Sequence, residues 1–124
     1  LLEPELASRA LPRAHLALID RMAAINGVID EMVAKGDAAG YVRTNLEFHR
    51  TLYLRAQAPA FLGLIETVWL QSGPTMRMLY ERLQRQQATE NHRKIIAALR
   101  AGDEPGLRLA IRVDVTQGLR MLAV

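Results

Sequence analysis

Three segments of this chain have apolar residues at helical spacing, and each apolar face is interrupted by side chains that can bind a metal. Residues that recur every three or four positions lie on one side of an α-helix. The three faces are Val42, Asn45, His49, Leu52 and Ala56; then His92, Ile95, Ile96 and Leu99; and finally Leu107, Ile111, Asp114, Gly118 and Met121. The pattern therefore predicts helices that turn polar groups toward a common core.

Placing these polar groups inside a domain is costly. An inward polar group without a partner costs about 1–3 kcal/mol, and a charged group costs more. Three such sites would consume much of the roughly 5–15 kcal/mol that holds a domain together. The groups must therefore satisfy one another, bind a shared ion, or line a wet cavity. We expect a small-molecule sensing pocket with a metal at its floor.

The composition is that of one soluble globular domain spanning residues 1–124, with half of its residues hydrophobic and a mean hydropathy of +0.01. No apolar run approaches the length of a membrane span, and no signal peptide is recognisable at the start. The chain contains no cysteine, which excludes disulfides and thiolate metal sites and fits a reducing cytoplasm. A metal here must be held by nitrogen and oxygen atoms.

The net charge of +3 does not indicate a nucleic-acid interface. The arginines are scattered along every predicted helix, are mixed with acidic residues, and are not interleaved with the few aromatic residues. A solvated helical surface explains this distribution. The chain begins at Leu1 rather than at a methionine, which is typical of a fragment cut from a longer protein.

The whole chain is predicted to be an all-α antiparallel bundle of six to seven helices, since the loops are short and no segment alternates like a strand. A glycine and an N-capping aspartate at Gly36-Asp37 separate the second helix from the third. We expect Ser72-Gly73-Pro74 to break or kink the fourth helix. The expected helices cover Glu3–Ala10, Pro12–Lys35, Asp37–Ala56, Pro59–Gln71, Thr75–Gln86, Thr89–Gly102 and a last helix with Pro105 in its first turn.

Four residues from these faces form the predicted metal site. Asn45 and His49 are one helical turn apart, and His92 and Asp114 come from two later helices. Imidazole and carboxylate ligands suit zinc, nickel, manganese or iron and leave positions open for water or an organic acid. The alternative is that each histidine is an ordinary hydrogen-bonded core residue. His15 has no partner at helical spacing and is expected to lie at the surface or to cap a helix.

Enzymes with known sequence signatures are poorly supported. The chain has no cysteine and no Gly-x-Ser-x-Gly motif, and it lacks a glycine-rich phosphate loop. A di-iron carboxylate bundle needs Glu-x-x-His pairs. Here each glutamate lies too close to its histidine to share a helix face with it, as in Glu47-Phe48-His49 and Glu90-Asn91-His92.

Several segments of this chain resemble motifs of the FadR-type C-terminal domain (FCD domain) of GntR-family transcription regulators. The segment 45–52 (NLEFHRTL) is similar to the Asp-x-x-Phe-His-x-x-Leu signature of that domain. The other similar segments are 2–7 (LEPELA), 58–62 (APAFL), 69–74 (WLQSGP) followed by Arg77, and 91–99 (NHRKIIAAL) followed by Gly102-Asp103. The resemblance covers nearly the whole chain and depends on the order and spacing of the motifs.

The resemblance implies an all-α effector domain that dimerises and responds to a small carboxylate metabolite. Many family members hold a divalent metal with Asp, His, His and His. By position, His49 and His92 match two of these histidines, Asn45 stands in the place of the aspartate, and Asp114 in the place of the last histidine. Two expectations stay open: a metal site (Zn, Ni or Mn) with one negative charge, or a site without metal, as in some family members.

The resemblance also implies an anchor for the effector carboxylate. A guanidinium can bind a carboxylate through two hydrogen bonds, and Arg77 is the expected anchor. Trp69, Met76 and Tyr80 fall on or near one helix face there and are expected to wall the pocket. The alternatives are that Arg77 is an exposed helix residue and that the other three belong to the core.

Operator DNA would be bound only by a winged helix-turn-helix domain, which in this family precedes the FCD domain and is absent from this chain. A symmetric homodimer would match the symmetry of an operator palindrome. Two other functions stay open: a small metal-dependent hydrolytic enzyme, and a purely structural dimerisation module. The enzyme would need a general base near the ion, and Glu47 falls on the wrong helix face for this role.

Overall fold

The computed structural model describes the backbone of residues 2–82 and 85–122 and the side chains of residues 2–71 and 89–117. All the regular elements in the described backbone are helices, which confirms the all-α prediction. They are α1 (Leu2–Ala10), α2 (Leu16–Lys35), α3 (Ala38–Tyr53), α4 (Pro59–Arg82), α5 (Arg85–Ala101) and α6 (Glu104–Leu122), with short 3-10 turns η1 (Leu11–Arg13) and η2 (Leu54–Ala56).

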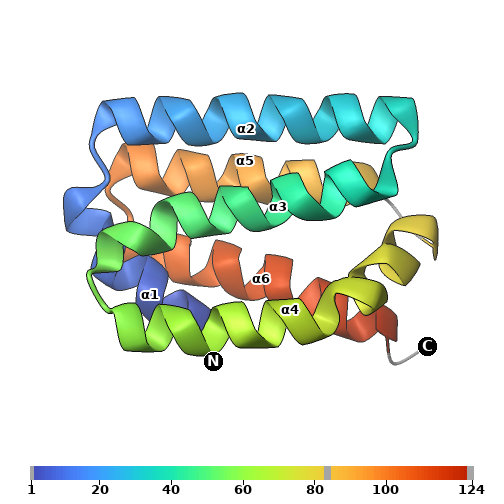
Figure 1. Ribbon diagram of the computed structural model, residues 1–124. Coiled ribbons are helices and arrows are strands. Elements are labelled where there is room, and N and C mark those ends of the chain that lie inside the picture. The colour runs from blue at the N-terminus through green and yellow to red at the C-terminus, as the bar shows by residue number, and fades with distance from the viewer. Residues whose placement is uncertain (1, 83–84, 123–124) are drawn as a thin grey trace.

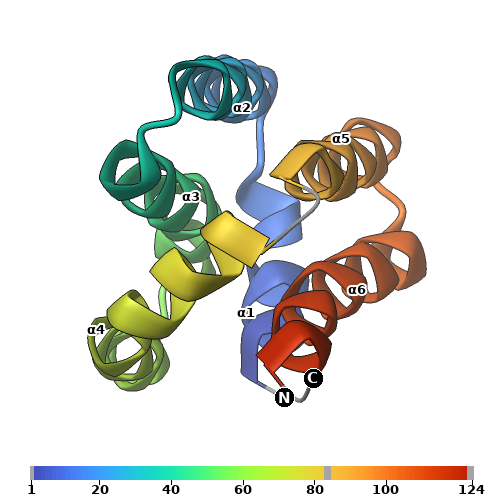
Figure 2. The ribbon, with the colours of Figure 1, turned by 90° about the vertical axis from the view of Figure 1, so that its right-hand side faces the viewer.

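The helices form an antiparallel bundle in which consecutive helices are connected by short loops (Figure 1). Seen along the bundle, α2, α3, α4, α6 and α5 follow one another around a ring, and the short α1 lies between α4 and α6 (Figure 2). This order brings α3, α5 and α6, which are far apart in the sequence, around one common interior.

Described residues of the three apolar faces predicted from the sequence fill much of the interior, whereas the predicted Gly118 and Met121 lie outside the described side chains. Leu52 of α3, Ile95 of α5, and Leu107 and Ile111 of α6 are fully buried. The face of α2 is buried at Ile19, Met22, Ile25 and Ile29. Burial of these aliphatic side chains stabilises the bundle by about 1.5–3 kcal/mol each before the entropy cost of folding.

The ends of α2 and α3 are set by local hydrogen bonds. The Nδ1 atom of His15 accepts a hydrogen bond from the Leu18 amide, so His15 is the N-cap of α2. Capping a helix was one of the two roles expected for His15. Gly36 adopts a left-handed conformation with φ of 71° at the end of α2, and Asp37 caps α3 by accepting from the Gly40 amide at 2.8 Å.

Three predicted helix boundaries were wrong. The helix α4 continues through Ser72-Gly73-Pro74 to Arg82, whereas separate helices over Pro59–Gln71 and Thr75–Gln86 were expected. A proline removes one helical hydrogen bond and bends a helix, but it does not force the helix to end. Figure 1 accordingly shows the C-terminal part of α4 turning away from the line of its first part.

The other two errors concern helix starts. The helix α2 begins at Leu16 rather than Pro12, because Pro12 lies in the turn η1, which precedes the His15 cap. The helix α5 begins at Arg85, so Thr89 lies inside the helix and is buried rather than capping it. A threonine signals a helix start only where the preceding residues leave the helix, and here they do not.

None of the helices in the described part of the chain is both long and apolar enough to cross a membrane.

The bundle predicts a strong contrast between two Leu→Ala substitutions. Leu52 is 0% exposed and Leu16 is 65% exposed. Leu52→Ala should lower the free energy of unfolding by about 2–5 kcal/mol, because it leaves a cavity in a packed interior. Leu16→Ala should change it by less than about 0.5 kcal/mol. Urea unfolding followed by circular dichroism measures both, and equal losses would contradict the described packing.

Candidate metal centre

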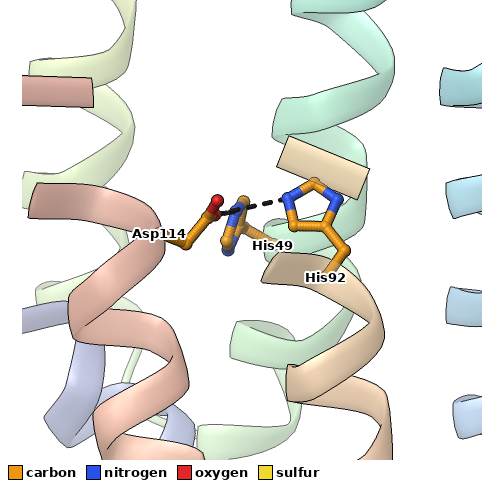
Figure 3. A group of neighbouring side chains, drawn as sticks. All are labelled: His49, His92 and Asp114. Atoms are coloured by element: carbon orange, nitrogen blue, oxygen red, sulfur yellow. Dashed lines mark hydrogen bonds and ion pairs between the residues drawn. The ribbon is translucent and has the colours of Figure 1, made fainter. Parts of the chain in front are cut away.

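Three side chains from three helices meet in the interior of the bundle. His49 comes from α3, His92 from α5 and Asp114 from α6, and each offers a ligand atom within 4.8 Å of the other two (Figure 3). The Asp114 carboxylate contacts both rings. Its Oδ2 atom is 2.9 Å from Nε2 of His49 and 3.3 Å from Nε2 of His92. The structure thus brings together three of the four predicted ligands, while their role as ligands stays a prediction.

The cluster is nearly closed to solvent. His92 is 0% exposed and His49 5% exposed, and the Asp114 side chain is also largely buried. The ring of Phe48 stacks on the ring of His92, with 4.0 Å between the centroids and 11° between the planes. A carboxylate in such surroundings needs a positive partner, because burial of an isolated charge is strongly unfavourable.

Burial and charge act in opposite directions on the three ionisable groups. Burial would raise the pKa of Asp114, but its hydrogen bond with His49 and the charge of His92 lower that pKa well below its usual range. Burial would lower the pKa of His49, yet the hydrogen bond and charge of Asp114 outweigh this effect and raise it. For His92 the effect of burial exceeds that of Asp114, so the pKa of His92 is lowered. The pKa values of the two histidines are therefore shifted in opposite directions, upward for His49 and downward for His92.

A second hydrogen bond orients His49 from the other side of its ring. The hydroxyl of Tyr53 donates to Oε1 of Glu3 at 2.8 Å and lies 3.3 Å from Nδ1 of His49. A phenol has a single proton, so the Tyr53 oxygen accepts from Nδ1–H of His49. Burial raises the pKa of Tyr53 well above its usual value, so the hydroxyl keeps its proton. This arrangement directs Nε2 of His49 toward Asp114.

The residues present fit a divalent metal. Nε2 of His92 is buried and has no hydrogen-bond partner among the described residues, although it lies 3.3 Å from Asp114 Oδ2. An orphaned ring nitrogen beside a carboxylate oxygen is a pair of lone-pair donors that a cation would satisfy together. Two imidazoles and one carboxylate form a donor set suited to zinc, nickel or manganese.

The fourth predicted ligand is Asn45, which lies half-buried on α3, one turn before His49. No described contact joins it to the cluster, and its role stays a prediction. Sequence reasoning missed another amide close to the cluster. Nδ2 of Asn91 donates to Asp114 Oδ1 at 3.4 Å and to Oε1 of Gln117 at 2.6 Å.

Asn26 and Tyr53 were also missed, although helical spacing carried a signal for both. Asn26 lies four residues after Met22 and three before Ile29, on the buried face of α2, and it contacts Nδ1 of His92 at 3.0 Å. Tyr53 follows His49 by four residues on α3, which places both side chains on one face.

The predicted effector residues lie on α4. Trp69 is half-buried, and its ring stacks on that of Tyr53 with a centroid distance of 6.1 Å, so it lies beside the group that touches His49. The side chains of Arg77, Met76 and Tyr80 lie outside the described residues. Their roles remain predictions.

Comparison with known proteins identifies the family. The family model of the FCD domain matches residues 1–116 of this chain. The HTH-type transcriptional regulator McbR of Escherichia coli (strain K12) is 30% identical over 91 residues, which cover 71% of this chain and 41% of McbR. The solved structure of E. coli McbR/YncC superposes with a TM-score of 0.89 at 24% identity, over 98% of this chain and 62% of that one.

The chain thus spans less than two thirds of these relatives. The superposition confirms the predicted fold. The family match, with a transcriptional regulator as a relative, supports the prediction that the chain is not an enzyme. The match over residues 1–116 also agrees with the resemblance seen in the sequence motifs. The chain therefore belongs to the FCD domain family, which forms the effector-binding domain of GntR-type transcription regulators.

Proposed function

We propose that this chain is the effector-sensing and dimerisation domain of a bacterial transcription regulator. In this proposal His49, His92 and Asp114 hold a divalent metal ion, with the amide oxygen of Asn45 as a further ligand. The observation that carries the proposal is the buried cluster in which Nε2 of His92 lacks a hydrogen-bond partner beside a carboxylate. A purely structural core would gain stability by replacing such a group with an apolar side chain.

A small carboxylate metabolite is the proposed effector. Three protein ligands leave a fourth position open on a tetrahedral zinc ion, and four leave two positions open on an octahedral ion such as manganese, which a carboxylate oxygen can fill. Arg77 is the proposed anchor for the rest of the acid, since a guanidinium binds carboxylates in a bidentate manner. Trp69, Met76 and Tyr80 are the proposed walls of the pocket, and Trp69 already lies beside Tyr53 next to the cluster.

The effector would act by shifting a conformational equilibrium. A ligand that contacts several helices favours one arrangement of them, and it shifts the equilibrium only by its difference in affinity between the two states. A winged-helix domain outside this chain would read that shift and bind operator DNA, in a cytoplasmic homodimer whose symmetry matches a palindromic operator.

Metal content tests the proposed centre directly. The domain should be purified without chelators or a metal-affinity tag and its metal measured by mass spectrometry. We expect one metal ion per chain in the wild type and none in the His49→Ala/His92→Ala double variant, which lacks both imidazole ligands. The matched control is His15→Ala, which removes the N-cap of α2 and should retain the metal. Well-folded wild-type protein that takes up no metal even when metal is added would overturn the proposed centre.

Asp114→Asn tests the single negative charge of the cluster. The substitution should weaken zinc binding by more than roughly 10–100-fold, which is the typical loss when a residue that hydrogen-bonds to a metal ligand is removed. In the metal-free protein it should also move the pKa of His49 from above its ordinary value to below it. Burial lowers that pKa, and the opposing effect of Asp114 would be gone.

An NMR titration of His49 and a competition assay for zinc measure these two effects. Asp103→Asn is the control, because Asp103 is an exposed carboxylate that caps α6 through the Gly106 amide, and asparagine caps equally well. An unchanged zinc affinity in Asp114→Asn would remove Asp114 from the site.

A panel of small carboxylic acids separates the sensor from the other two functions. We expect at least one acid to raise the melting temperature of the metal-loaded wild type, because a ligand that binds only the folded state stabilises it. The double variant His49→Ala/His92→Ala should show no such rise. The acid should be recovered unchanged after long incubation. Consumption of the acid would indicate an enzyme, and binding of neither metal nor acid would indicate a structural module.

A further inference from the structure

A buried asparagine in the middle of α2 makes two hydrogen bonds that reach α5. Asn26 is 4% exposed. Its Nδ2 atom donates to the backbone carbonyl of Thr89 at 3.2 Å, and its Oδ1 atom lies 3.0 Å from Nδ1 of His92. Thr89 and His92 are on neighbouring turns of α5, so one amide holds both the backbone and the imidazole of that helix.

These two contacts determine which ring nitrogen of His92 carries the proton. A carbonyl oxygen only accepts, so the NH₂ end of Asn26 must face Thr89 and the oxygen end must face His92. The amide oxygen also only accepts, so Nδ1 of His92 must be the donor. A neutral imidazole has a single N–H, and its Nε2 atom therefore carries a lone pair. This is the same Nε2 atom that is buried without a hydrogen bond beside Asp114.

We propose that Asn26 is a positioning residue that holds His92 in the Nδ1–H tautomer and so keeps its Nε2 lone pair available to a metal ion. The proposal rests on the metal centre proposed above and assigns to it a residue on a fourth helix. In the other tautomer, Nε2–H of His92 would donate to Oδ2 of Asp114 at the same 3.3 Å separation. Nε2 of His92 would then carry a proton directed at Asp114 and would have no lone pair to offer a cation.

Among the described neighbours of His92, Asn26 is the residue that favours the Nδ1–H tautomer. Phe48 stacks on the face of the ring and fixes its plane, but a stacked ring has no preference between the two tautomers. Asp114 lies at the Nε2 side and favours a proton there. Asn26 is the described contact on the Nδ1 side, and only its amide oxygen favours the proton at Nδ1. A hydrogen bond from the second ring nitrogen also strengthens an imidazole as a metal ligand.

The tautomer can be read directly by ¹H–¹⁵N correlation NMR of the histidine rings in metal-free protein, at alkaline pH where the imidazoles are neutral. We expect wild-type His92 to show a protonated Nδ1 and an unprotonated Nε2. Asn26→Leu, which removes the acceptor at nearly constant volume, should move the proton to Nε2 and weaken zinc binding roughly 10–100-fold. Asn26→Asp retains an acceptor and should restore the Nδ1–H tautomer.

The matched control is Thr44→Val, which removes another buried hydrogen-bonding side chain of the bundle, one bonded to the Gly40 carbonyl. It should leave both the tautomer and zinc affinity unchanged. An Nε2–H tautomer in the wild type would overturn the proposal without any variant having to fold. An unchanged tautomer in Asn26→Leu would overturn it equally, as would a zinc affinity equal to that of Thr44→Val.

The failure of this proposal is distinct from the failure of the metal centre. A wild type that holds His92 as Nδ1–H but takes up no zinc would contradict the metal centre and leave the tautomer assignment intact. A wild type that binds zinc with His92 in the Nε2–H tautomer when metal-free would leave the metal centre intact and remove Asn26 from it.

Discussion

The buried carboxylate of Asp114 is the group on which the arrangement of this interior depends. It brings a negative charge from α6 to within 2.9 Å of a ring nitrogen on α3 and 3.3 Å of one on α5. An unpaired charge there would cost several kcal/mol, so the three helices must stay together around it. The surrounding apolar side chains stabilise the bundle as a whole, but they are compatible with many small shifts of one helix against another. The polar cluster does not tolerate such shifts, because hydrogen bonds are sensitive to both distance and direction.

The hydrogen bonds outside the cluster extend this constraint to two more helices. Glu3 of α1 holds Tyr53, which in turn holds His49, and Asn26 of α2 holds His92. Any shift of the rings that accompanies ligand binding would therefore change contacts made by α1 and α2. The helix α1 is the first helix of the described chain, so in the proposed regulator it would follow the DNA-binding domain in sequence. A path of polar contacts joins the centre to that helix.

Helical periodicity predicted much of the fold and only part of the site. It placed Leu52, Ile95 and Ile111 in the interior, and the glycine and aspartate at the start of α3 set its boundary correctly. It failed at Pro74, because the end of a helix in the middle of a bundle depends on packing as well as on the local chain. It missed the orienting role of Asn26 because that role exists only through His92, which lies 66 positions later. Spacing along one helix reveals its inward polar residues, but their partners depend on how the helices are packed.

The position of the carboxylate gives this centre a property of its own. By the resemblance described above, Asn45 on α3 stands where an aspartate is expected and Asp114 on α6 where a histidine is expected. The carboxylate of Asp114 lies within 3.3 Å of a ring nitrogen of each histidine, and against the lowering effect of burial it raises the pKa of His49. A metal ion that enters the proposed site competes with any proton held by His49, because an imidazolium has no lone pair to offer. Metal affinity should then fall with decreasing pH from a higher pH than for a site with ordinary histidines. The same ion pair stabilises the centre when no metal is bound, so the carboxylate that would attract the ion also competes with it for the imidazole.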